Sequence, residues 1–313
     1  MWGYLIRRVF AVLPVMLVVA VIVFLMLRLT PGDPAAKIAG DAATSEDIAQ
    51  LRTELGLDRS LPVQFGIWMG DLLTGDFGES FYYKRPVASM INDGIEPTLS
   101  LATFTIILAC LIAIPLGTWA AYRQGSWIDR FVMGFSVIGF SVPVFVIGYI
   151  LVYFLSVKLE WFPVQGYQHI AEGIGGWAYR LVLPSVALSV IFVALIARMT
   201  RTSVLEVLNE DYVRTARAKG LPQMQVLLRH ALRNAAVPIV TVIGIAIAVL
   251  ISGVVVTESV FAIPGLGLLT LDAIQGGDYP TVQALIILFS AVYVVINLFI
   301  DVLYTVLDPR IRY

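Results

Sequence analysis

The residues best suited to a chemical role form a basic stretch between Asp211 and Pro238, "DYVRTARAKGLPQMQVLLRHALRNAAVP". Gly220 and Pro222 divide it, and glycine favours the end of one helix while proline favours the start of the next. A basic elbow of this kind can rest on anionic lipid headgroups, where each charge contributes about 1 kcal/mol. It can equally dock on a protein partner. The residues alone leave both interpretations open.

Two short helices are expected to form this elbow. Helix-forming residues dominate 206–219, and a second helix is expected over about 222–236. Arg229 and Arg233 are four residues apart and share one face of the second helix. Another face is predicted to be apolar and to contain Met224, Leu227, Leu228, Ala231 and Leu232.

Asp301 is a second candidate, because an ionisable side chain inside an apolar run is a functional site by default. With Asn297 one turn before it, Asp301 would suit a proton-coupled secondary transporter, which we keep as the alternative function. However, Asp301 precedes Asp308 by only about 10 Å of helix. We favour pairing with a loop arginine near the membrane boundary. A receptor without transport has no signalling domain to support it.

The remaining reactive residue types predict neither a metal site nor an enzyme. His169 and His230 have no partners at metal-ligand spacing and are expected at the surface. Cys110 is the only cysteine and lies in an apolar run, which excludes an internal disulfide. The P-loop pattern G-x-x-x-x-G-K-[ST] does not occur. We therefore expect no ATP hydrolysis by a P-loop mechanism and no cofactor bound by this chain.

The elements that carry these residues are predicted to be membrane helices. The chain of 313 residues is 59% hydrophobic and only 14% charged, with a mean hydropathy of +0.87, whereas soluble domains are about 25% charged. A helix needs roughly 20 apolar residues to cross the hydrocarbon core. Six spans are expected, over about 9–28, 99–121, 131–157, 181–199, 235–257 and 282–307.

The distribution of arginine and lysine predicts the orientation. A cytoplasmic N-terminus and six alternating spans put the C-terminus and the basic elbow in the cytoplasm, as expected from the enrichment of short cytoplasmic loops in basic residues. The first span follows "LIRRVF" but is too long for a signal peptide, so a retained anchor is expected. The basic residues assigned to the cytoplasm are Arg7, Arg8, Arg123, Arg130, Arg198, Arg201, Arg214, Arg217, Lys219, Arg229, Arg233, Arg310 and Arg312.

Four segments are expected along the chain: an N-terminal span (1–28), a periplasmic segment (29–98), a five-helix core (99–307) and a cytoplasmic tail (308–313). The core would include the elbow as a cytoplasmic loop over 200–234. In the periplasmic segment, Thr44 or Ser45 should cap a helix that stops near Gly56, and a second helix should cover about 62–73. These boundaries follow from composition and capping residues.

Prolines inside or beside the spans are expected to kink helices. Pro143 is the most suggestive, because Ser136, Gly139, Ser141 and Gly148 give its helix a surface of small residues. Such a surface favours close helix packing. The alternative is that Ser136, Ser141 and Pro143 line a transport pathway.

The basic stretch resembles the cytoplasmic EAA loop of binding-protein-dependent ABC importers, in the form found in the dipeptide/oligopeptide permease family. Gly220 matches the glycine of that loop, Ala216 the second alanine and Leu232 the later leucine, while Arg214 and Thr215 replace the Glu and the first Ala. Further matching segments follow in order over about 300 residues. They are "PGDP" at 31–34, "ELGLD" at 54–58, "GDFG-S" at 75–80, "VFAIPGLG" at 260–267, "DYP-VQA" at 278–284 and the ending "INLFIDVLYTVLDPRIRY".

This resemblance implies an all-α membrane protein of six transmembrane helices, a type I ABC importer transmembrane domain with a small external subdomain. It would be a multi-pass subunit of the bacterial inner membrane that forms half of a pathway for di- or oligopeptides or related small solutes. Implied partners are a second homologous permease, two cytoplasmic ATPases that bind ATP and Mg, a periplasmic solute-binding protein and membrane lipid, but no nucleic acid. The implied ATPase-coupling helix contains Glu210, Asp211, Tyr212, Arg214, Thr215, Ala216, Arg217, Ala218, Lys219 and Gly220.

Overall fold

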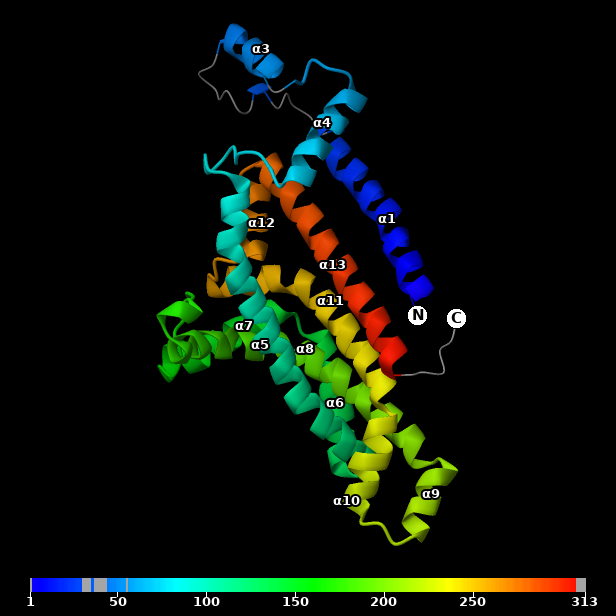
Figure 1. Cartoon of the computed structure of the whole chain (residues 1–313). Coiled ribbons are helices and arrows are strands. Elements are labelled where there is room, and N and C mark those ends of the chain that lie inside the picture. Colours follow the sequence, from blue (N-terminus) through cyan, green and yellow to red (C-terminus); the bar gives the residue numbers. More distant parts are fainter. Residues whose placement is uncertain (1, 30–34, 37–43, 55, 308–313) are drawn as a thin grey trace. The chain divides into compact units, whose positions relative to one another are not determined.

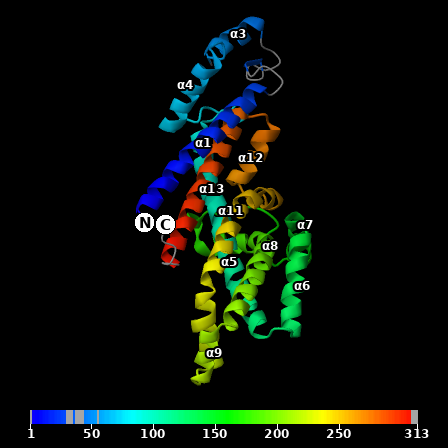
Figure 2. The same cartoon turned by 90° about the vertical axis from the view of Figure 1, so that its right-hand side faces the viewer.

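The computed structural model describes residues 2–29, 35–36, 44–54 and 56–307, and Figures 1 and 2 show it in two views. The described residues fold into helices, with one isolated β-bridge between Glu79 and Pro86 and no longer strand. The chain divides into two compact units. The first contains residues 1–5, 95–268 and 295–313, and the second contains 6–94 and 269–294.

The first unit is a helical bundle built around α8, which is the most deeply buried of its long apolar helices. Its core includes the fully buried side chains of Leu101, Leu188, Ile196 and Leu250. Its elements are α5 (Val87–Tyr122, from residue 95 onward), α6 (Trp127–Ser141), α7 (Val144–Leu151), the π-helix η1 (Val152–Lys158), the 3-10 helix η2 (Ile170–Glu172), α8 (Ile174–Leu208), α9 (Asp211–Ala218), α10 (Gln223–Gln225), the π-helix η3 (Val226–Leu232) and α11 (Ala236–Phe261).

In the second unit, α4 packs along α1. Phe24 of α1 makes an edge contact with Phe65, with ring centroids 5.2 Å apart, and also contacts Trp68. Ala20, Val23 and Ile287 complete a small apolar core. The elements are α1 (Trp2–Leu29), α3 (Ser45–Glu54), α4 (Leu61–Thr74), α12 (Leu266–Gln275, from residue 269) and the first part of α13 (Tyr279–Leu307).

The two predicted helices of the external segment are present. Thr44 precedes α3 and exchanges hydrogen bonds with Asp47: its hydroxyl donates to Asp47 Oδ2 at 2.7 Å, and the Asp47 amide donates back at 3.3 Å. Gly56 has a φ of +64°, consistent with the predicted end of the helix. α4 covers the second prediction within one residue at each end. The motif at 31–34 lies outside the described residues.

Among the described residues, three helices are long and apolar enough to cross a membrane, and the number rises to six if each of three bent helix pairs forms one span. The predicted spans 99–121, 181–199 and 282–307 lie within the single helices α5, α8 and α13, and α11 covers the predicted span 235–257 except for its first residue. The predicted span over 131–157 is one of these bent pairs, and its break lies at the kink expected at Pro143. α6 and the segment Val144–Lys158 meet there at 101°, because Val142 is extended and Pro143 cannot continue the helix.

The connections of the first unit gather at two ends, in the grouping that the alternating spans predict. At one end, Ala121 at the end of α5 packs with Leu208, Val213 and Val226 of the elbow region. At the other end, Glu96 of α5 accepts a hydrogen bond from the Ile170 amide at 2.9 Å. The Gly166 amide there donates to the carbonyl of Phe261 at 2.9 Å.

A buried carboxylate, that of Glu258, connects the elements at this second end through hydrogen bonds. Glu258 is fully buried and accepts hydrogen bonds from the Thr98 hydroxyl at 2.6 Å and the Leu268 amide at 2.9 Å. A Cβ on Gly265 would lie 2.1 Å from the Glu258 carboxylate, so only glycine fits there. The "IPGLG" segment thus packs closely against α5 and α11. Its backbone approaches their side chains too closely for a Cβ, which explains why glycine occurs there.

Candidate coupling site

The elbow begins where α8 ends. Glu210 has an extended backbone (φ −70°, ψ 147°), and its carbonyl accepts hydrogen bonds from the amides of Val213 and Arg214, so a new helix begins at Asp211. The predicted continuous helix over 206–219 is therefore wrong at 209–210. Asp211 lies in the first turn and Arg217 in the last, an order that suits the helix dipole.

One face of α9 is fixed to the body of the first unit. Val213 is fully buried and Ala216 is 7% exposed, and both pack against Val204, Leu227 and Ala231. Residues three apart lie on the same side of a helix. Ala216 thus belongs to the inward face, whereas Val213, which the sequence analysis did not single out, is its main anchor. The spacing of Val213 three residues before Ala216 could have predicted this buried face.

The opposite face of α9 is exposed and mostly polar. Arg214 forms an exposed ion pair with Asp211 at 3.2 Å, which contributes little to stability. Tyr212 is 44% exposed, and partial burial raises the pKa of its hydroxyl. Figures 1 and 2 both show α9 at an extremity of the first unit. Of the predicted coupling residues, those exposed here are Glu210, Asp211, Tyr212, Arg214, Thr215, Arg217, Ala218, Lys219 and Gly220.

Gly220 reverses the chain after α9. Its φ is +78°, and its amide donates to the Arg217 carbonyl at 3.0 Å. A Cβ at this position would meet nothing within 4 Å, so the requirement for glycine is one of backbone conformation and not of space. The predicted glycine turn is confirmed.

The second arm of the elbow differs from the predicted helix over 222–236. A short α-turn, Gln223–Gln225, passes into the π-helix Val226–Leu232, and α11 starts at Ala236 after a bend of 61°. The wider π-turn changes which side chains share a face. Leu227 and Ala231 are buried as predicted, but Met224 and Leu228 are exposed and Val226 is buried instead.

The small-residue surface of α6 and α7 is a packing surface. A Cβ on Gly139 would lie 3.0 Å from Ala194 Cβ of α8. Ser136 is 1% exposed, and its hydroxyl donates to the Val132 carbonyl of its own helix at 2.8 Å. Ser141 and Pro143 are exposed beside the bend. A pathway role for Ser136, Ser141 and Pro143 stays a prediction.

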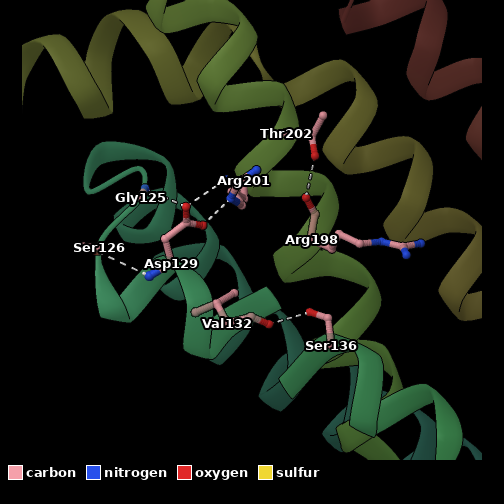
Figure 3. A network of polar contacts seen from close by, with 8 residues as sticks. All are labelled: Gly125, Ser126, Asp129, Val132, Ser136, Arg198, Arg201 and Thr202. Atoms are coloured by element: carbon pink, nitrogen blue, oxygen red, sulfur yellow. Dashed lines mark hydrogen bonds and ion pairs between the residues drawn. The ribbon is translucent and has the colours of Figure 1, made fainter. Parts of the chain in front are cut away.

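An ion pair missed by the sequence analysis joins α6 to α8 (Figure 3). The Arg201 guanidinium donates to both carboxylate oxygens of Asp129, at 2.9 Å from Nη2 to Oδ2 and through Nε to Oδ1. The Gly125 amide also donates to Oδ2 at 2.9 Å, and Ser126 Oγ accepts from the Asp129 amide at 3.4 Å. The spacing Ser126-x-x-Asp129 was the available signal for this helix start.

The two histidines and Asp301 complete the predicted sites. His169 is exposed as predicted, but its Nδ1 lies 3.0 Å from Glu96 Oε2. His230 is partly buried. The side chain of Asp301 lies outside the described part of the structure. Among the described residues, no three His, Cys, Asp or Glu side chains converge on a metal-sized site.

An apolar helical chain with several membrane-length helices, and with an exposed elbow at one end of its bundle, has the architecture of a multi-pass membrane protein. Comparison with known proteins shows which family it is. Residues 113–313 match the family described as "Binding-protein-dependent transport system inner membrane component", and residues 1–102 match its N-terminal companion family. The chain belongs to this family of inner-membrane transport components.

Similar proteins cover the whole chain. A probable peptide ABC transporter permease protein, y4tP, of Sinorhizobium fredii is 52% identical over 99% of both chains. A putative peptide transport system permease protein of Brucella abortus and the glutathione transport system permease protein GsiC of Salmonella typhimurium are each 42% identical over 100% of both chains. A chain of the MetNI methionine ABC transporter, in an inward-facing conformation, matches with a TM-score of 0.58 and 20% identity, covering 70% of this chain and 96% of that chain.

These matches confirm the resemblance and the all-α importer fold that the sequence predicted. The protein is a multi-pass membrane permease subunit, and its family implies an ATPase and a solute-binding protein as partners. The alternative of a proton-coupled secondary transporter receives no support from any of these relatives.

Proposed function

We propose that this chain is one permease subunit of an ATP-driven importer for peptides or related small solutes, and that α9 is its coupling helix. The exposed face of α9 carries the proposal. Its inner face is fixed by Val213 and Ala216, so a force applied to the outer face moves the helix with its neighbours. The peptide class is supported by relatives named as peptide or glutathione permeases at 42–52% identity.

The remaining parts of the importer follow from this proposal. A second homologous permease completes the pathway, and two cytoplasmic subunits bind ATP with Mg, so that this chain binds no cofactor itself. A solute-binding protein delivers cargo on the periplasmic side. The elbow and both termini are cytoplasmic, and lipid surrounds the outer helices. The basic side chains near α9 support this orientation.

Tyr212 supplies the test of docking. Aromatic side chains often dominate protein interfaces, and loss of one costs about 2 kcal/mol, or roughly 30-fold in affinity. In the assembled transporter purified through a tag on this chain, Tyr212→Ala should lose ATPase subunits and import. Tyr82→Ala is the matched control, because this tyrosine is 61% exposed and lies outside the elbow, in the external segment.

The competing interpretation of the elbow gives the opposite result. If it only rests on lipid, Tyr212→Ala keeps its ATPase subunits, and combined neutralisation of Arg214, Arg217 and Arg229 disturbs membrane insertion instead. Proton-driven uptake that disappears in Asp301→Asn would replace the importer mechanism with that of a secondary transporter.

A further inference from the structure

The start of α6 is held to α8 by a nearly buried ion pair. The side chains of Asp129 and Arg201 are 7% and 18% exposed, and the guanidinium meets both carboxylate oxygens. This two-point geometry fixes orientation as well as distance. Figure 3 shows the pair bridging the first turn of α6 and the later part of α8.

The carboxylate is also fixed from its own side. Besides the guanidinium, Asp129 Oδ2 accepts from the Gly125 amide, and Ser126 Oγ caps the helix at the Asp129 amide. Gly125 has a φ of +77°, which brings its amide into this position. The pair therefore joins the α5–α6 turn, α6 and α8 at one point.

From Arg201 the path to the elbow is short and rigid. Within two turns further along α8, Val204 and Leu208 belong to the same apolar cluster as Val213 of α9. α5 packs on this same stretch of α8: a Cβ on Gly117 of α5 would lie 2.4 Å from the Ala197 carbonyl, so α5 and α8 touch along their backbones. A displacement of α9 therefore reaches Arg201 without a flexible segment between them.

From Asp129 the path leads to the bend. α6 runs as a single helix from Trp127 to Ser141 and touches α8 again near its end, at Gly139 and Ala194. The chain then turns by 101° into the next helical segment, where a Cβ on Gly148 would lie 3.4 Å from Phe261 of α11. α6 is thus a short helix that contacts α8 at both ends, and the bend at Pro143 connects it to α7.

We propose that the Asp129–Arg201 pair is the joint that transmits movement of α9 to the bent element formed by α6 and α7. Both residues act as positioning residues in coupling ATP hydrolysis to transport, and this role rests on the proposed function of α9. The competing explanation is that the ion pair only stabilises the packing of α6 on α8. The two differ in a testable way, because replacing both members of a buried pair often restores stability whereas removing one leaves an unpaired charge.

The experiment uses the assembled transporter in liposomes with its loaded binding protein. Two quantities are measured for each variant, the thermal midpoint of the purified complex and the amount of solute imported per ATP hydrolysed. Asp129→Asn and Arg201→Gln alone should lower both. The double variant should recover the midpoint but keep a ratio reduced about five-fold or more, a typical lower limit for coupling between sites.

Arg130→Gln is the matched control. It removes an exposed arginine from the same turn of α6 and should leave the ratio at the wild-type value. Arg201→Lys keeps the charge but loses the two-point contact. It should assemble with a reduced ratio, which keeps the test decisive if the double variant does not fold.

A wild-type ratio of solute imported per ATP hydrolysed, in the double variant or in Arg201→Lys, would overturn the proposal. The ion pair would then serve only to stabilise the fold. A different result is expected if α9 is not a coupling helix at all. In that case Tyr212→Ala keeps its ATPase subunits and its import, whatever the pair variants do.

Discussion

At the scale of single residues, neighbouring positions in α9 have different roles: some anchor the helix to the bundle, and others form its exposed face. Val213 and Ala216 face the bundle, and Tyr212, Arg214 and Arg217 face away from it. The inward pair is apolar, so the helix is fastened by burial and the charged side chains stay available. Substitutions at adjacent positions should therefore have different effects, on stability in one case and on docking in the other.

Gly220 can be tested through its backbone alone. Because nothing lies within 4 Å of a Cβ there, a substitution acts through its φ of +78°. Gly220→Val should cost about 1–3 kcal/mol locally and reduce the ATPase subunits retained on purification. Gly220→Asn is the control, since asparagine adopts this conformation several-fold more readily than most residues. Equal retention in both variants would show that the turn is not required for docking.

Asp47 predicts a pH response confined to α3. Hydrogen bonds from the Thr44 hydroxyl and amide hold the pKa of its carboxyl below the ordinary value. A lowered pKa stabilises the helix start above the unfolded value of about 3.9, and this contribution is lost as the pH falls through the folded pKa. The protection of α3 amides, measured as the intrinsic exchange rate at each pH divided by the observed rate, should therefore fall below about pH 4. In Asp47→Asn this fall should disappear, and its persistence would contradict the assignment.

At the scale of elements, glycines mark where helices touch. A Cβ on Gly117 would lie 2.4 Å from the Ala197 carbonyl, whereas a Cβ on Gly134 of α6 would meet nothing within 4 Å. Gly117→Ala should therefore separate α5 from α8 and cost about 1–3 kcal/mol. Gly134→Ala should be neutral or stabilising by up to about 1 kcal/mol, because alanine favours helix.

Thermal unfolding of the purified chain in detergent measures both effects. A Gly117→Ala variant as stable as Gly134→Ala would show that α5 and α8 are not in backbone contact. The pair of variants removes the same hydrogen and adds the same methyl group, so helix propensity cancels between them.

The sequence predicted those features that depend on local pattern. Apolar composition revealed the long helices and α4, Thr44 and Gly56 gave correct boundaries for α3, and Gly220 and Pro222 gave the elbow turn. It missed the break at Glu210, because helix propensity is high on both sides. The Asp129–Arg201 pair was also missed, since its members are 72 residues apart and only the packing of α6 on α8 brings them together.

At the scale of the whole molecule, the arrangement of loops explains the charge pattern. Within the first unit, the α5–α6 turn and the elbow share one end, and the loop after η1 shares the other end with the end of α11. The end that carries the elbow holds Arg123, Arg130, Arg229 and Arg233. Positive charge on one side of a membrane bundle indicates the cytoplasmic face.

Impermeant thiol labelling in intact cells tests this orientation. Single cysteines at Ser45, Val164 and Gln223, in a Cys110→Ala background, are exposed positions in α3, the loop after η1 and the elbow. Ser45→Cys and Val164→Cys should be labelled from outside, and Gln223→Cys only after the cells are permeabilised. The two external positions belong to different units, so agreement between them also tests whether the spans alternate from α1 through α7. Labelling of Gln223→Cys in intact cells without labelling of Ser45→Cys would reverse the orientation and remove α9 from the reach of any cytoplasmic ATPase.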